Sequence, residues 1–443
     1  MSTETQTPIH LAGALAPVPD EIDAVDLPVR GSLPKELNGR YLRNGPNPRP
    51  GENPGHWFAG HGMLHGVRIA DGRAEWYRNR WVRTAKLAGE PRQRPDGGVN
   101  LTAHSANTHV IHHDGHLLAL SEGGLPYEVD RELNTLGPCD FGGRLTTAMT
   151  AHPKRDPVTG ELFFFGYSLK PPYLTGHRLS ARGELVSSTP IDVPGPTMMH
   201  DFAITERFII WMDLPITFHP ELVGKGSPFQ WDDAYGARLG VMPRDGKPRV
   251  TWFDVEPCYV FHVANAFDDG DDVVLDAVRY DRSGWARVWT GARDAADGNI
   301  ALYRWRLDLA GGTASGRYLD DTGVEFPTIN ETRLGRPNRY LYSVADDFEA
   351  ERAAFVKYDT VSGSSAAHRL EPGMRPGEAV FVPAADATRE DDGWLLSIVT
   401  ERSGRSSELL VCDASDPTAA PRAAIELPRA VPAGFHGSWI EEE

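Results

Sequence analysis

The sequence is poor in cysteine, which excludes two kinds of architecture. Only three cysteines occur in 443 residues, Cys139, Cys258 and Cys412, and they are far apart with no Cys-x-x-Cys pair. An odd and dispersed set of thiols builds neither a disulfide framework nor a thiolate metal site. We therefore expect reduced cysteines that pack as small apolar residues.

Long apolar runs and an excess of positive charge are missing as well. No stretch approaches the ~18 apolar residues of a membrane span. Residues 1–19 hold neither the basic region nor the apolar run of a secretory signal, so the expected location is the cytoplasm. The 62 acidic side chains outnumber the 45 basic ones and give a net charge of -17, which repels phosphate backbones. Nucleic acid is therefore not an expected partner.

The chain is instead rich in short apolar and aromatic runs separated by Asp, Gly, Asn and Pro. Most runs have the length of a β-strand, and few segments show a long helical period. The clearest runs are 117–120, 162–167, 208–214, 273–280, 302–309, 340–344, 394–399 and 409–412. This texture predicts an all-β protein in which helix is a minor component, built either as stacked sandwiches or as a propeller.

Four histidines favour the propeller. His152, His200, His262 and His436 each stand among small or apolar neighbours near the start of a predicted strand. Residues so far apart in sequence can meet at one point only in a closed fold, where the innermost strand of every blade faces the axis. We predict a seven-bladed β-propeller over residues 28–443 that follows a flexible segment, 1–27. The irregular segments 170–172 and 215–249, with short helices, are expected to cover one face.

A shared metal site is one interpretation of these histidines, and ordinary core packing is the other. Four imidazoles without a carboxylate or thiolate suit a borderline divalent ion such as Fe(II), although Zn, Cu and Ni also accept this ligand type. Ligand imidazoles usually donate their second ring N–H to a carboxylate. The candidate acids in strand context are Glu122, Glu325 and Glu378.

Other polar clusters are better explained as turns. His61 and His65 have the spacing of a helical zinc pair, but flanking glycines disfavour a helix there. Residues 112–116 contain Asp-Gly and predict a hairpin turn. Residues 268–272 are acidic but lack the ligand pattern of a calcium loop, so they also predict a hairpin turn.

Several motifs together resemble the carotenoid cleavage oxygenase family, which includes enzymes that cleave apocarotenoids, retinoids and stilbenes. The resemblance extends over nearly the whole chain. The motifs are Tyr41-Leu42-Arg43-Asn44-Gly45-Pro46-Asn47, Phe58-Ala59-Gly60-His61-Gly62-Met63, Thr150-Ala151-His152-Pro153, Met199-His200-Asp201-Phe202, Phe261-His262-Val263-Ala264-Asn265-Ala266, Glu325-Phe326-Pro327, Glu378-Ala379-Val380-Phe381-Val382-Pro383 and Phe435-His436-Gly437.

The resemblance implies a seven-bladed propeller with Fe(II) on its axis, held by the four histidines. By motif position it pairs Glu122 with His200, Glu325 with His262 and Glu378 with His436, and leaves His152 without a carboxylate. The implied reaction is oxidative cleavage of an alkene by O2 into two carbonyl products. The implied partners are O2 and a small hydrophobic alkene, and no organic cofactor is required.

Two positions bear on the choice of alkene. Lignostilbene-type members resemble one another in having Lys directly before the first glutamate and Tyr near the position of Trp81, and this chain has Ser121 and Trp81 there. This difference favours an apocarotenoid over a phenolic alkene, while a phenylpropene or stilbenoid stays open. Because charges interrupt the apolar residues of 215–249, we expect at most a transient peripheral contact with a membrane.

Two other classes of protein compete with this interpretation. In the first, the propeller is a non-enzymatic scaffold whose histidines only pack. In the second, it is a hydrolase that carries zinc or calcium, which would need a carboxylate among the metal ligands. The motif positions supply no such carboxylate.

Overall fold

The computed structural model describes residues 7–223, 227–245, 248–290, 298–347 and 350–442, and strands dominate these ranges. Their only α-helix is α1 (Arg282–Thr290). Short 3₁₀ turns occur at η1 (Ile9–Leu11), η2 (Gly13–Leu15), η3 (Trp57–Ala59), η4 (Pro220–Leu222) and η5 (Glu331–Arg333). The prediction that helix is a minor component is confirmed.

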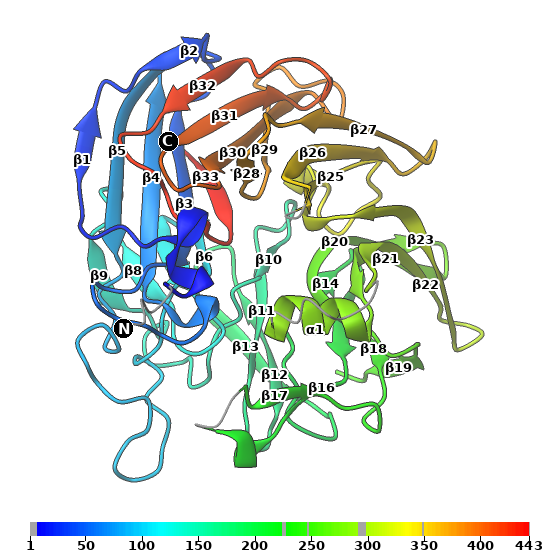
Figure 1. The fold of residues 1–443 in the computed structure, drawn as a ribbon. Helices are drawn as coiled ribbons and strands as arrows, with labels where there is room; N and C mark the ends of the chain where they lie inside the picture. The colour runs from blue at the N-terminus through cyan, green and yellow to red at the C-terminus, as the bar shows by residue number, and fades with distance from the viewer. Residues whose placement is uncertain (1–6, 224–226, 246–247, 291–297, 348–349, 443) are drawn as a thin grey trace, which may run out of the picture. The chain divides into compact units, whose positions relative to one another are not determined.

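Within the described residues the strands form seven sheets of four or more strands and one two-stranded ribbon (Figure 1). The seven sheets are the blades of a seven-bladed β-propeller, so the predicted fold class is confirmed. By internal contacts the chain divides into two compact units. The first comprises Met1–Asp140, Asp346–Lys357 and Ala366–Glu443, and the second Phe141–Ala345 and Tyr358–Ser365.

The first unit contains three complete sheets. The first has the order β1 (Asp23–Val25), β5 (Arg73–Trp81), β4 (Gly62–Ala70), β3 (Gly39–Pro46) and β33 (Gly437–Glu441). The second runs β6 (His109–His113), β7 (His116–Leu120), β8 (Tyr127–Val129) and β9 (Thr135–Pro138). The third runs β2 (Val29–Gly31), β32 (Ala423–Glu426), β31 (Ser407–Asp413), β30 (Gly393–Glu401) and β28 (Met374–Pro376), and β29 (Val380–Pro383) also pairs with β30.

The second unit also contains three complete sheets. The first runs β10 (Lys154–Arg155), β11 (Leu162–Tyr167), β12 (Leu174–Leu179) and β13 (Leu185–Ile191). The second runs β14 (Ala203–Ile204), β15 (Phe208–Asp213), β18 (Arg238–Pro243) and β19 (Thr251–Asp254). The third runs β20 (Tyr259–Asp269), β21 (Asp272–Tyr280), β22 (Ile300–Asp308) and β23 (Thr313–Gly323). The ribbon pairs β16 (Ile216–Phe218) with β17 (Phe229–Trp231).

The seventh blade has the order β24 (Glu325–Thr328), β25 (Tyr340–Asp347), β26 (Arg352–Asp359) and β27 (Ser364–Arg369).

The two ends of the chain meet within the sheets of the first unit. β33, near the C-terminus, pairs with β3, and β2 pairs with β32 (Figure 1). Just before β33, the N–H of Asn44 in β3 donates to the carbonyl of His436 at 3.0 Å. The histidine near the C-terminus is therefore held by backbone from the start of the chain.

The predicted N-terminal segment, 1–27, lies partly outside the described residues. Of the remainder, β1 pairs with β5, and the N–H of Ala14 donates to the carbonyl of Arg402 at 3.0 Å. The boundary at residue 28 and the reading of 28–443 as one domain stay predictions.

The predicted irregular segment 215–249 contains regular structure, which corrects that part of the prediction. Its described residues include the ribbon β16–β17 and all of β18, which pairs with both β15 and β19 inside a blade. The apolar run that forms β18 is only a few residues long and is bordered by Arg238 and Arg244, so it did not stand out from a charged loop. Residues 224–226 and 246–247 lie outside the described residues. The shorter segment 170–172 is irregular, as predicted.

The turns predicted at 112–116 and 268–272 are confirmed, whereas the turn predicted around His61 and His65 is wrong for His65, which lies in a strand. β6 and β7 form a hairpin whose turn residues, Asp114 and Gly115, both have positive φ, as a two-residue turn requires. Residues 268–272 likewise join β20 to β21. His65 lies in β4, where its Nδ1 is 2.9 Å from the hydroxyl of Tyr77, so it forms no helical pair with His61.

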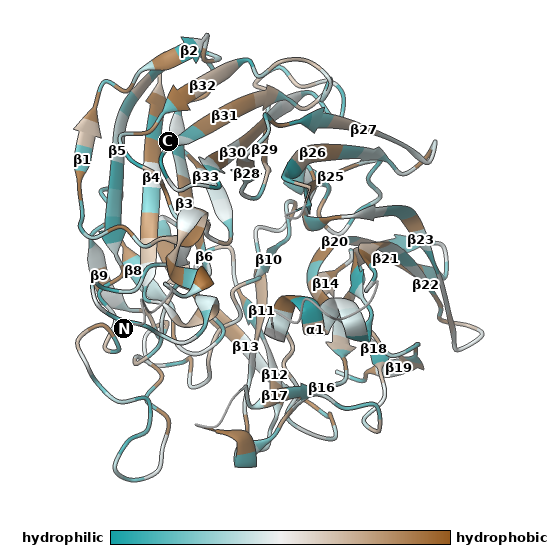
Figure 2. Cartoon of the chain, viewed as in Figure 1, coloured by the Kyte–Doolittle hydropathy of each residue, from teal (hydrophilic) through white to brown (hydrophobic). Residues whose placement is uncertain are grey.

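Within each unit, apolar side chains pack between neighbouring sheets. Figure 2 shows brown, hydrophobic residues along β31, whose inner face joins a buried cluster of the first unit. In the second unit Phe202 stacks on Trp211, with ring centroids 5.6 Å apart. No helix of the described ranges is long and apolar enough to cross a bilayer.

A close approach between two blades requires glycine at position 176. An ideal Cβ on Gly176 of β12 would lie 2.7 Å from the indole ring of Trp211 in β15, closer than real Cβ contacts. Trp211 is only 1% exposed, so the ring has no room to move away.

We therefore expect Gly176→Ala to destabilise the protein by about 1–3 kcal/mol through overpacking. Gly323→Ala is the matched control, because its Cβ would meet its nearest neighbour at an ordinary 3.6 Å. The control should be neutral or slightly stabilising. Denaturant unfolding of both variants checks this, and equal midpoints would contradict the packing argument.

Candidate metal centre

Each of the four histidines lies near the start of an edge strand. His152 precedes β10, His200 precedes β14, His262 lies in β20 and His436 precedes β33. All four strands stand at one end of the strand order of their sheets. The repeated blade therefore places an imidazole at the same structural position several times.

The three histidines of the second unit converge. The Nε2 atoms of His152 and His200 are 3.0 Å apart, and their ring centroids are 4.5 Å apart. The ring of His262 is 5.2 Å from each of the other two. At this separation both Nε2 atoms could contact one metal ion.

A threonine joins two of these histidines through the backbone. The hydroxyl of Thr150 donates to the carbonyl of His200 at 3.3 Å and accepts from the N–H of His152 at 3.2 Å. Thr150 is 1% exposed, so this bridge is protected from water. It connects the residues just before β10 to the residues just before β14.

Glu325 orients His262. Its Oε2 atom lies 2.5 Å from Nδ1 of His262, and the same carboxylate accepts from the hydroxyl of Tyr280 and from the N–H of Phe326. Burial raises the pKa of Glu325, but the His262 ring, the Tyr280 hydroxyl and the Phe326 amide together lower it below its ordinary value. The carboxylate therefore accepts the Nδ1 proton of His262, which makes Nε2 the atom with the metal-binding lone pair.

Phe326, which supports both Glu325 and His262, has an unusual backbone conformation. Its φ is +51°, in the left-handed region that bulky residues rarely adopt. In this conformation its N–H points at Glu325, and its ring stacks on His262 with centroids 5.2 Å apart. One residue thus supports both the carboxylate and the imidazole.

Glu378 has the same role for His436 in the first unit. Its Oε1 atom lies 3.1 Å from Nδ1 of His436, and its Oε2 atom accepts from the N–H of Gly437 at 2.8 Å. Burial raises the pKa of Glu378, while His436, His109 and the Gly437 amide lower it, and the net pKa is below its ordinary value. His436 therefore also has its Nε2 lone pair available for a metal.

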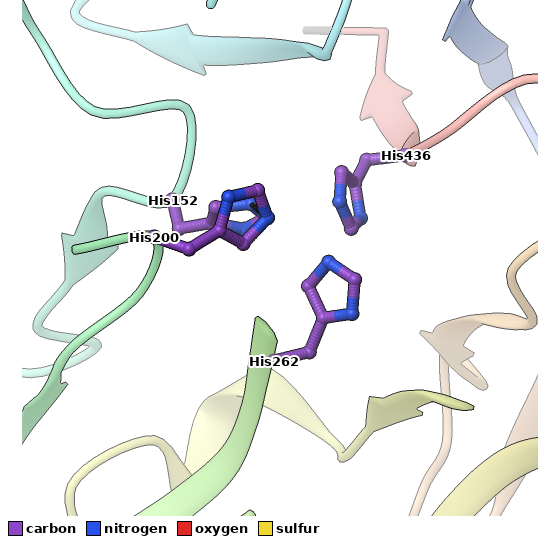
Figure 3. Close-up of side chains that lie close together, drawn as sticks. All are labelled: His152, His200, His262 and His436. Carbon is purple, nitrogen blue, oxygen red and sulfur yellow. Dashed lines mark hydrogen bonds between the residues drawn. The ribbon is translucent and has the colours of Figure 1, made fainter. Parts of the chain in front are cut away.

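Together the four histidines form one group whose ligand atoms all lie within 4.8 Å of one another. Figure 3 shows the four rings turned toward a common point. Neutral imidazoles, two of them with Nδ1 at a carboxylate, are suitable ligands for a borderline divalent ion. The donor set fits the predicted metal.

The remaining predicted residues stay predictions as site residues. Glu122 is half-buried just after β7, and its pairing with His200 is untested. Ser121 is buried, with its hydroxyl 2.8 Å from Nδ1 of His104. Trp81 ends β5 and donates its indole N–H to the carbonyl of Asn47 at 2.9 Å.

Sequence reasoning missed Thr150 and Tyr280. Thr150 stands two residues before His152, so a polar residue beside a ligand was an available signal. Tyr280 is 45 residues from Glu325, and only the folded position of β21 brings the two together. No local pattern could have identified that contact.

Comparison with known proteins places the chain in a family. Residues 15–441 match the model of the family described as RPE65, retinal pigment epithelial membrane protein. This chain belongs to the RPE65/carotenoid cleavage oxygenase family. The protein is a carotenoid-cleavage-type oxygenase, rather than the scaffold or the hydrolase considered above.

The relatives extend over nearly the full chain. A "Carotenoid cleavage oxygenase" of Mycobacterium tuberculosis is 40% identical, covering 99% of this chain and 98% of its own. A "Carotenoid 9,10(9',10')-cleavage dioxygenase" of Crocus sativus is 38% identical over 98% of this chain and 89% of its own.

Solved structures agree with the fold. The lignostilbene dioxygenase of Pseudomonas brassicacearum is 30% identical, has a TM-score of 0.89 and matches over 99% of both chains. The cobalt-substituted apocarotenoid oxygenase of Synechocystis is 29% identical, has a TM-score of 0.83 and matches over 96% of this chain and 97% of its own.

The carboxylates should matter for metal affinity. Glu325→Gln and Glu378→Gln keep the side-chain shape but replace one acceptor oxygen with an NH2 group, so each should weaken metal binding about 10- to 100-fold. Anaerobic titration with Fe(II) measures this. Glu371→Gln, at an exposed position, serves as the control and should bind like the wild type. Unchanged affinity in both carboxylate variants would be inconsistent with the orienting role.

Proposed function

We propose that this protein is a non-haem Fe(II)-dependent dioxygenase that cleaves a C=C double bond of a carotenoid or apocarotenoid. The observation that carries the proposal is the group of four histidines, two of them held by carboxylates. The reaction balances as one alkene and one O2 giving two carbonyl products. No other oxidant or reductant is needed.

The chain's own residues would bind the iron, orient the imidazole rings and exclude water. His152, His200, His262 and His436 would hold the iron, and the bound ion would supply the activation of O2. Phe261 lies edge-on to His200 with centroids 5.2 Å apart, and Phe326 stacks on His262. These rings place apolar surface beside two of the imidazoles, which limits the access of competing water to the reacting groups.

Ser121 and Trp81 support a non-phenolic substrate. Neither position carries a cation or a phenol to grip a substrate hydroxyl. The Ser121 hydroxyl contacts His104, and the Trp81 indole N–H is used by a backbone carbonyl. The names of the Mycobacterium and Crocus relatives also favour a carotenoid-type alkene. For such a substrate we propose at most a transient peripheral contact with a membrane.

A stilbenoid or phenylpropene is the second candidate. It is favoured by the structural likeness to the Pseudomonas lignostilbene dioxygenase, whose TM-score of 0.89 exceeds the 0.83 of the Synechocystis apocarotenoid oxygenase. Under this alternative, another residue would have to contact the phenolic hydroxyl.

His200→Ala should abolish turnover and remove most of the bound iron while the protein stays folded, because it deletes one of four ligands. His116→Ala is the control, since His116 is exposed on the β6–β7 hairpin and should leave iron content unchanged. Iron analysis, circular dichroism and turnover are measured on both. Full activity in His200→Ala would refute the iron assignment.

A product assay decides between the two substrate classes. Fe(II)-loaded protein in air is given an apocarotenal and a hydroxystilbene separately, and the aldehydes are identified by mass spectrometry. We expect cleavage of the apocarotenal. Cleavage of the hydroxystilbene alone would overturn the substrate proposal and favour the second candidate.

A further inference from the structure

An ion pair between a half-buried lysine and a buried aspartate lies beside the metal ligands of the second unit. Asp201 directly follows His200 and is 1% exposed, and its Oδ1 atom lies 2.8 Å from Nζ of Lys154. Its Oδ2 atom accepts from the N–H of Val263 at 2.8 Å. Lys154 stands two residues after His152, and Val263 directly follows His262. A single carboxylate therefore contacts all three histidine-bearing segments.

Two of the three segments lie beside strands that are too short to fix them. β10 and β14 each contain only two residues, so few backbone hydrogen bonds hold Lys154 and Asp201 in register with their neighbours. A ligand set needs its atoms held within a fraction of an ångström. Contacts other than the sheet ladder must supply that precision here.

Stability alone does not account for the pair. A buried ion pair adds little stability over apolar side chains of the same shape, because both charges lose their hydration. This pair makes contacts with three of the four segments that supply the ligands, those of His152, His200 and His262. Its Asp201 also fixes the chain direction after His200, since Oδ1 accepts from the N–H of Phe202 at 2.7 Å.

We propose that Asp201 and Lys154 are positioning residues that hold His152, His200 and His262 in register for one metal ion. They act through the backbone beside each ligand and touch neither the substrate nor the ion. The inference rests on the metal centre of the proposed function but is independent of the substrate.

The test measures metal binding directly. Asp201→Asn removes the charge while keeping the shape, and Lys154→Met removes the ammonium group. We expect each to weaken Fe(II) binding about 10- to 100-fold in anaerobic titration. Both should also change the visible absorption of the Co(II)-loaded protein, which depends on ligand geometry. Lys154→Arg keeps a cation that can reach Asp201 and should restore most of the affinity.

A second buried Lys–Asp pair provides the control. Lys357 and Asp391 in the first unit are 2.6 Å apart, with side chains 9% and 6% exposed, and Asp391 contacts no segment that carries a ligand histidine among the contacts described. Asp391→Asn should lower the unfolding midpoint about as much as Asp201→Asn but leave Fe(II) affinity and the Co(II) spectrum unchanged.

The outcomes separate this inference from the proposed function. If Asp201→Asn and Lys154→Met bind Fe(II) about 10- to 100-fold more weakly than the wild type while Asp391→Asn binds it equally well, the inference stands. If all of them bind Fe(II) equally, the pair is only structural and the inference fails. If the wild type itself binds no iron, the proposed function fails instead.

Discussion

The constraint on which the site depends is that several imidazole nitrogens must share a small space with their lone pairs directed at one point. His152 and His200 bring their Nε2 atoms to 3.0 Å, a distance that two imidazolium ions would not tolerate. Neutral rings with convergent lone pairs can be stabilised by one cation. The surrounding structure has to keep the rings correctly oriented and close.

The carboxylates orient two of the imidazole rings. Glu325 and Glu378 remain ionised despite burial, because each accepts several hydrogen bonds, including one from a backbone N–H. Each carboxylate faces Nδ1 of one histidine and so determines which nitrogen can bind a metal. Tyr280 and Phe326 in turn hold Glu325, so the geometry of His262 depends on contacts from two other strands.

The repeated blades of the propeller place the histidines close to one another. Every ligand lies near the start of an edge strand, so the repeat supplies the placement and each blade needs to vary only a few residues. Two of these strands, β10 and β14, are only two residues long. Thr150 and the Asp201–Lys154 pair add contacts at the points where the sheet ladder is too short to be sufficient.

The sequence alone predicted the propeller, the four histidines and the pairing of Glu325 and Glu378 with theirs. These features have local signals: short apolar runs, a histidine beside small residues near a strand start, and motifs that resemble a known family. It did not predict β18, whose apolar run is short and bordered by arginines, or the contact of Tyr280 with Glu325. The register that brings Asp201 to Lys154 and to Val263 is likewise absent from any local pattern. Such contacts join residues that are tens of positions apart, and their distances are set by how strands pair and blades pack, which only the tertiary structure decides.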